Sequence, residues 1–142
     1  VAFARDGEPL GELANRVALA PPGYHLAVRH GRLHLARTPE RHSCRPSVDV
    51  LFESVALECG AAAAGCLLTG MGRDGAMGLL AMRRAGGSTI AQDEASSVIY
   101  GMPREAALLG AAMQVRPLRD IGPDHKSACI LDGWNHSVAG TA

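Results

Sequence analysis

Residues 61–91 read AAAAGCLLTGMGRDGAMGLLAMRRAGGSTIA, and this stretch decides the fold. Ala61 to Leu68 is a nearly continuous apolar run, which is typical of a strand buried on both faces of a parallel sheet. Its alanine-rich start alternatively belongs to the end of a preceding helix. A glycine-rich turn over 69–75, an amphipathic segment over 76–85 and a short strand over 88–91 follow. This order predicts a βαβ unit, and therefore an α/β fold with a mainly parallel sheet.

The segments on either side fit the same architecture. Upstream, Pro46 is predicted in the first turn of a helix whose apolar stripe runs from Val48 to Cys59 and which stops at Gly60. Asp49, Glu53 and Glu58 fall off that stripe. The remaining predictions are a strand over 17–20, a hairpin over 24–28 and 32–36, a helix over 103–110 with Pro103 first, and a strand over 113–118.

Length and charge exclude several classes of protein. The 142 residues suit a single domain, and 14 basic residues balance 14 acidic ones, so attraction to nucleic acid has no support from the whole chain. No apolar run approaches the roughly 18 residues of a membrane span, and no secretory signal is visible. The four cysteines have no CxxC pair and no metal-ligand spacing. The default expectation is a cytoplasmic protein with no bound metal, no nucleic-acid partner and no insertion into a membrane.

The glycine-rich turn carries one carboxylate, Asp74, at the carboxyl end of a predicted parallel strand. Loops at that edge of an α/β sheet gather function. One interpretation makes Asp74 the acid that orients a histidine in a hydrolytic triad. A plainer one lets Asp74 bond only its local backbone, because Asp-Gly is a common turn pair.

A third interpretation is a dinucleotide site. Gly70, Gly72 and Gly75 fit the pattern G-x-G-x-x-G between a strand and a helix. Asp93 and Glu94 lie about 20 residues on, where a ribose-binding acid is expected. Against this stands the negative charge of Asp74, which would repel a pyrophosphate in the same loop. Spacing alone does not choose between these interpretations.

Four stretches resemble the chemotaxis methylesterase (CheB) family. They are LLTGMGRDGA at 67–76, GGSTIAQDEASS at 86–97, YGMPREA at 100–106 and RPSVDVLF at 45–52. The resemblance covers about residues 5 to 121. It implies an α/β catalytic domain of the three-layer, doubly wound type, here as its C-terminal part over 1–121, with the domain's N-terminal strands missing. The divergent stretch over 122–142 is expected to be a poorly ordered tail.

The resemblance also implies a function. The family hydrolyses methyl esters on glutamate side chains of chemoreceptors, and several members deamidate receptor glutamines, with a Ser-His-Asp triad and without metal or cofactor. Asp74 corresponds to the triad aspartate, and Met71 to a neighbour of the oxyanion pocket. Methyl-accepting chemotaxis receptors are the implied partners, with a receiver domain or a chemotaxis kinase as further candidates.

The sequence departs from the family at two points of the triad. The family's serine and histidine motifs precede the region matched here, and none of Ser88, Ser96, Ser97 or the six histidines occupies their positions. We therefore expect the 142 residues alone to show no esterase activity. Two alternatives remain: a nonenzymatic Rossmann-like nucleotide-binding module that uses the Gly70-Gly72-Gly75 loop, and an inactive relic that binds receptors.

Overall fold

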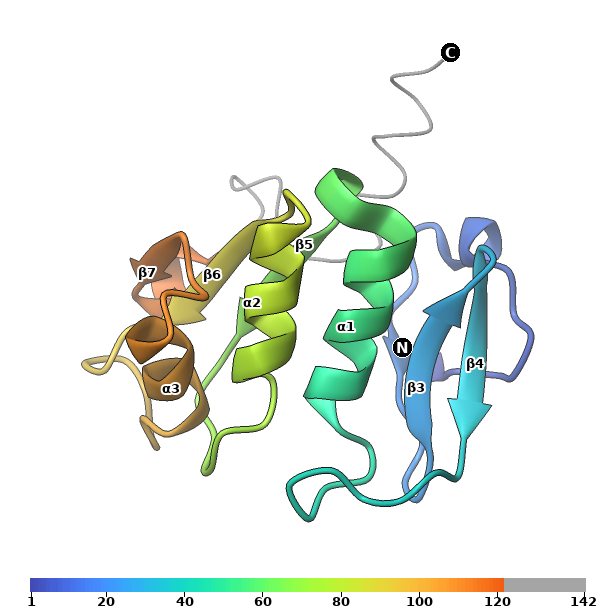
Figure 1. The fold of residues 1–142 in the computed structure, drawn as a ribbon, viewed down its shortest axis with the longest axis horizontal. Coiled ribbons are helices and arrows are strands. Elements are labelled where there is room, and N and C mark those ends of the chain that lie inside the picture. Colours follow the sequence, from blue (N-terminus) through green and yellow to red (C-terminus); the bar gives the residue numbers. More distant parts are fainter. Residues whose placement is uncertain (122–142) are drawn as a thin grey trace.

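The structure is a computed structural model that describes residues 1–121, so the predicted tail over 122–142 lies outside the described residues. Its central element is a parallel sheet in the order β5-β6-β7, made of β5 (Ala64–Leu67), β6 (Ser88–Gln92) and β7 (Gln114–Arg116). Helix α2 (Ala76–Arg84) connects β5 to β6, and α3 (Met102–Leu108) connects β6 to β7. Helix α1 (Val48–Cys59) lies beside α2, and the hairpin packs beyond α1 (Figure 1). This is the predicted three-layer α/β class, with a parallel sheet flanked by helices.

The N-terminal part forms two small sheets. Strands β3 (His25–Arg29) and β4 (Arg32–Ala36) make the predicted hairpin, whose turn residues His30 and Gly31 both have positive φ, at 51° and 69°. Positive φ at both positions belongs to the tight turn that matches the twist of paired strands. The prediction missed β1 (Ala2–Phe3), which pairs in parallel with β2 (Ala18–Leu19). The short 3-10 helices span Leu10–Leu13, Gly60–Ala62 and Leu118–Asp120.

Close packing of α2 sets the position of the core. A side chain at Gly65 of β5 would come within 2.8 Å of Leu79 and 2.9 Å of Met82, and one at Gly78 would come within 2.7 Å of Phe52. Leu79 and Met82 are fully buried between the sheet and α1. Glycine at these two positions therefore lets α2 approach both the strand below it and the helix beside it.

Several local predictions need correction. Pro46 is not in the first turn of α1: its peptide bond to Arg45 is cis, Ser47 is the N-cap, and the helix begins at Val48. Asp49, which falls off the apolar stripe of α1, is fully buried, because neighbouring segments donate hydrogen bonds to its carboxylate. Strand β5 begins at Ala64, since the alanines before it lie in a 3-10 turn. Along the predicted helix over 76–85, Leu79 is fully buried and Leu80 is only half-buried. Pro103 is the second residue of α3, not the first.

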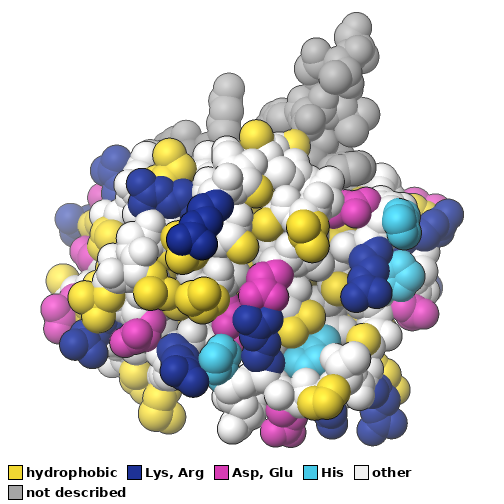
Figure 2. All heavy atoms as spheres, viewed as in Figure 1, with side chains coloured by type: hydrophobic (Ala, Val, Ile, Leu, Met, Phe, Trp, Pro, Cys, Tyr) yellow, Lys and Arg dark blue, Asp and Glu magenta, His cyan; other side chains and the backbone are white. Residues whose placement is uncertain are grey.

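Over residues 1–121, none of the helices is both long and apolar enough to cross a membrane. On the face shown in Figure 2, basic and acidic side chains lie intermixed over the surface rather than separated into regions of one sign. That mixture agrees with the zero net charge of the chain.

Candidate active site

The carboxylate of Asp74 lies in the loop that leaves the carboxyl end of β5, and the residue is only 6% exposed. Gly75, which follows it, has a φ of +90°, and a side chain there would come within 2.7 Å of Leu67 and 2.9 Å of Val48. Only glycine combines that backbone conformation with so close an approach. The loop is therefore pressed between the end of β5 and the start of α1, and Asp74 is held at that junction.

Three groups at the start of α1 donate hydrogen bonds to Asp74. Oδ1 accepts from the Ser47 hydroxyl at 2.7 Å and from the Asp49 amide at 3.1 Å, and Oδ2 accepts from the Val48 amide at 2.7 Å. The amides at a helix N-terminus lack partners within the helix and carry partial positive charge, so a carboxylate is stabilised there. A carboxylate offers about four acceptor sites, so one site on Oδ2 remains open to a further donor.

Asp49 binds the neighbouring helix in the same way. Its Oδ1 accepts from the amide of Gly78, in the first turn of α2, at 2.6 Å. Its Oδ2 lies 3.1 Å from Nε2 of His42. Nδ1 of His42 accepts from Nε of Arg73 at 3.2 Å, so Nε2 carries the proton and donates to Asp49. Through His42, the loop before α1 is tied to the glycine-rich loop.

The glycine-rich loop also contacts the segment before α3. The amide of Gly70 donates to Ile99 O at 3.0 Å, and the carbonyl of Gly70 accepts from the Met102 amide at 2.8 Å. A side chain on Gly101 would lie 2.6 Å from Gly70 O. Two stretches about 30 residues apart, GMGRDG and YGMP, thus form one edge of the molecule at the carboxyl end of the sheet. Met71 projects from this edge and is 80% exposed.

Two further groups lie at this edge of the sheet. The fully buried Gln92 side chain, at the end of β6, accepts from the amide of Thr69 at 2.8 Å. Asp93 accepts from the hydroxyl and the amide of Ser96 at 2.6 and 3.0 Å, and these bonds lower the pKa of its carboxyl. The AQDEASS stretch therefore braces the loop from the side.

Comparison with known proteins decides the family. A family model described as CheB methylesterase matches residues 1–124. The chain belongs to the CheB methylesterase family. It is 56% identical over 107 residues to the protein-glutamate methylesterase FrzG of Myxococcus xanthus, and the match covers 75% of this chain and 32% of that protein. It is 54% identical over 126 residues to a protein-glutamate methylesterase/protein-glutamine glutaminase of Bordetella parapertussis, with 83% of this chain and 35% of the relative covered.

A solved structure supports the same assignment. The CheB methylesterase catalytic domain of Thermotoga maritima superposes with a TM-score of 0.72 at 31% identity, and the match covers 81% of this chain and 62% of that one. The chain spans about a third of the length of the curated CheB relatives it matches. The fold and the family are therefore shown, while the activity of a complete CheB protein is an inference for this chain.

A serine, a histidine and an aspartate do come together in this CheB chain, but not as a triad. His25 accepts a hydrogen bond at Nδ1 from the backbone amide of Ser47 at 3.2 Å, not from its hydroxyl. The Ser47 hydroxyl instead donates directly to Asp74. Ser47 and His25 are 2% and 1% exposed, so no ester can reach them. Across residues 1–121, no hydrogen bond joins a serine hydroxyl to a histidine ring.

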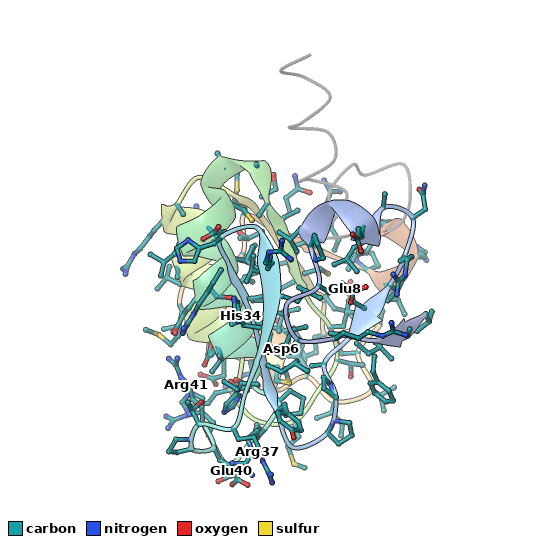
Figure 3. All side chains as sticks on the ribbon, turned by 90° about the vertical axis from the view of Figure 1, so that its right-hand side faces the viewer. Asp6, Glu8, His34, Arg37, Glu40 and Arg41 are labelled. Carbon is teal, nitrogen blue, oxygen red and sulfur yellow. The ribbon has the colours of Figure 1, made fainter. Side chains whose placement is uncertain are left out.

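The histidines give no metal site in the described part of this CheB domain. His25 and His34 lie on the paired strands β3 and β4, but Nε2 of His25 binds Pro39 O at 2.9 Å, whereas Nδ1 of His34 lies 3.7 Å from Oδ1 of Asp6 (Figure 3). Within residues 1–121 no group of three or more His, Cys, Asp or Glu side chains could hold a metal ion.

Sequence reasoning missed Ser47 and Asp49. A serine directly before a helical stripe is a recognised N-cap signal, so Ser47 could have been placed, although its partner could not.

Proposed function

We propose that this chain supplies the carboxylate of a Ser-His-Asp triad that hydrolyses γ-glutamyl methyl esters on methyl-accepting chemotaxis receptors. In this reaction the serine attacks the ester carbonyl and methanol leaves. Water, activated by the same histidine, then hydrolyses the acyl-enzyme. Relatives are named protein-glutamate methylesterase, and several also protein-glutamine glutaminase, so receptor glutamine deamidation belongs to the same proposal.

The observation that carries the proposal is the environment of Asp74. The acid of a triad must stay in one orientation, accept a hydrogen bond from a histidine ring and stabilise the imidazolium that forms. Asp74 is held by three donors and retains one open acceptor site on Oδ2. A histidine N–H that reaches this site would complete the Asp-His half of the triad.

The serine and the histidine are proposed to come from outside the described residues. Met71, exposed on the same edge, is proposed to border the pocket for the ester oxyanion. We further propose that residues 1–121 act as the C-terminal part of the catalytic domain, that the reaction needs no cofactor, and that it takes place in the cytoplasm. A receiver domain or a chemotaxis kinase is proposed to regulate it.

The dinucleotide alternative receives no support from the geometry. A phosphate at the N-terminus of α2 would need free amides there, but the amide of Gly78 already donates to Asp49. The carboxylate of Asp74 lies in the same loop and would repel the phosphate. Titration with NAD(P) or ATP checks this point: saturable binding that is lost in Gly72→Val would favour the nucleotide-binding module.

The experiment for the proposed function measures methanol release from methyl-esterified receptor membranes. The complete product of the gene that encodes this chain is expected to release methanol, and Asp74→Ala is expected to abolish the release. The 142-residue chain by itself is expected to match its own Asp74→Ala variant. A complete protein that releases no methanol yet still binds receptors would favour the inactive relic and contradict the proposal.

A further inference from the structure

Ser47 occupies the N-cap of α1 but does not cap the helix with its own side chain. Its backbone is extended, with φ −111° and ψ 133°, as an N-cap requires. An N-cap serine ordinarily accepts a hydrogen bond from an amide of the first turn through its hydroxyl oxygen. Here the hydroxyl donates to Oδ1 of Asp74, and Asp74 takes the two amides of the first turn instead. Asp74 therefore caps helix α1, and the Ser47 hydroxyl donates a hydrogen bond to the carboxylate of Asp74.

The backbone of Ser47 is fixed as well. Its amide donates to Nδ1 of His25, and Nε2 of His25 in turn donates to the carbonyl of Pro39. Both ring nitrogens of the buried His25 are thus engaged, which orients its ring. Strand β3, through His25, and the loop after β4, through Pro39, therefore hold the backbone of Ser47 in place. This fixes the position from which the Ser47 hydroxyl reaches Asp74.

We propose that Ser47 is a positioning residue for Asp74. This inference rests on the proposed function, because it concerns the acid of the proposed triad. Without the Ser47 hydroxyl, only the amides of Val48 and Asp49 in the first turn of α1 would hold the Asp74 carboxylate. The Ser47 hydroxyl is the third donor to the carboxylate and the second on Oδ1, so rotation of the carboxylate about its Cβ–Cγ bond would break a short, buried hydrogen bond. The open acceptor site on Oδ2 is then kept in one fixed orientation, as the acid of a triad requires.

The test compares kcat and KM for methyl-ester hydrolysis by the complete gene product and its variants. Ser47→Ala is expected to lower kcat by about tenfold to a hundredfold with KM unchanged, because misorientation of a catalytic group costs rate rather than binding. Ser47→Thr keeps the hydroxyl and is expected to recover most of the loss. A full kcat in Ser47→Ala would overturn the inference, and so would an equal loss of kcat in Ser47→Thr.

Ser54→Ala is the matched control. Ser54 lies in the same helix, accepts from the Val28 amide at 2.9 Å and donates to Leu51 O at 2.7 Å, but has no contact with Asp74. It should lose stability as Ser47→Ala does, measured by urea unfolding, and keep kcat. A drop in kcat in both variants would assign the effect to helix stability and refute the positioning role.

The variant Asp74→Asn separates failure of this inference from failure of the proposed function. If Asp74→Asn stays active, the proposed function fails whatever the result for Ser47.

Discussion

Asp74 and Asp49 each bind the first turn of the other's helix. Asp74, in the loop that leads into α2, accepts the amides of Val48 and Asp49 at the start of α1. Asp49, in the first turn of α1, accepts the amide of Gly78 in the first turn of α2. Each carboxylate thus stabilises the positive end of the neighbouring helix dipole. The exchange locks the two helices side by side, with the open acceptor site of Asp74 at the junction.

Replacing Asp74 with asparagine should destabilise the fold as well as remove the charge. Asparagine keeps one oxygen acceptor but turns an amide group toward a backbone or hydroxyl donor that then lacks a partner. Hydrogen bonds to a buried charged group contribute about 1.5–3 kcal/mol, so we expect a loss of about 2 kcal/mol in the free energy of unfolding by urea. Asp120→Asn, an exposed carboxylate beside Arg119, is the control and should stay within about 0.5 kcal/mol of the wild type. An equally small change in Asp74→Asn would contradict the capping role.

The close approach of α1 and α2 predicts a penalty at Gly78. A methyl group there would lie 2.7 Å from Cβ of Phe52 and 3.0 Å from the Cα of Asp49, so the helices must separate. Overpacking of this kind costs about 1–3 kcal/mol. Gly11→Ala is the control, because nothing lies within 4 Å of its added methyl group. If both alanine variants unfold at the same urea concentration, the helices are not as tightly packed as described.

Cys66 should be slow to react in the folded protein. Burial in β5 raises the pKa of its thiol to about 11 from the ordinary 9.0, because the thiolate is poorly solvated there. At pH 8 this leaves about a hundredfold less thiolate than in the unfolded chain, so iodoacetamide labelling should slow at least in that proportion.

The raised pKa of Cys66 also makes the free energy of unfolding depend on pH. The thiol form is favoured in the folded state, so its contribution to the free energy of unfolding is complete below the ordinary pKa of 9.0 and declines as pH rises toward about 11.

Mass spectrometry of labelled peptides between pH 7 and pH 11, with the urea-unfolded chain as reference, measures the reactivity of the Cys66 thiol. Equal labelling rates for Cys66 in the two states at pH 8 would refute the burial argument.

The fold class follows from short-range patterns in the sequence. The apolar run before GMGRDG and the period of 76–85 predict a strand and a helix because each depends only on residues within one element. Strand β1 was not predicted from the sequence. It spans only Ala2–Phe3, and its pairing with Ala18–Leu19 depends on a segment elsewhere in the chain. The same limit placed Pro46 inside α1, because the cis peptide bond between Arg45 and Pro46 leaves no trace in the hydrophobic pattern.

The site was predictable in its key residue and not in its contacts. Asp74 stands out because it is the one carboxylate in a glycine-rich loop at a strand end. Its donors come from residues some 26 positions earlier, and no periodicity links them. The burial of Asp49 was not predictable for a related reason. A polar residue off an apolar stripe ordinarily faces water, whereas here the amide of Gly78 and the ring of His42 replace water as its donors.

The most direct measurement of the central claim is kcat for methyl-ester hydrolysis by Asp74→Asn in the complete gene product. Asp120→Asn, at an exposed carboxylate with no contact to the glycine-rich loop, is the matched control. If Asp74 orients the triad histidine, its kcat should fall by about three to four orders of magnitude while Asp120→Asn stays near the wild type. A folded Asp74→Asn protein that hydrolyses the ester at the wild-type rate would contradict the account.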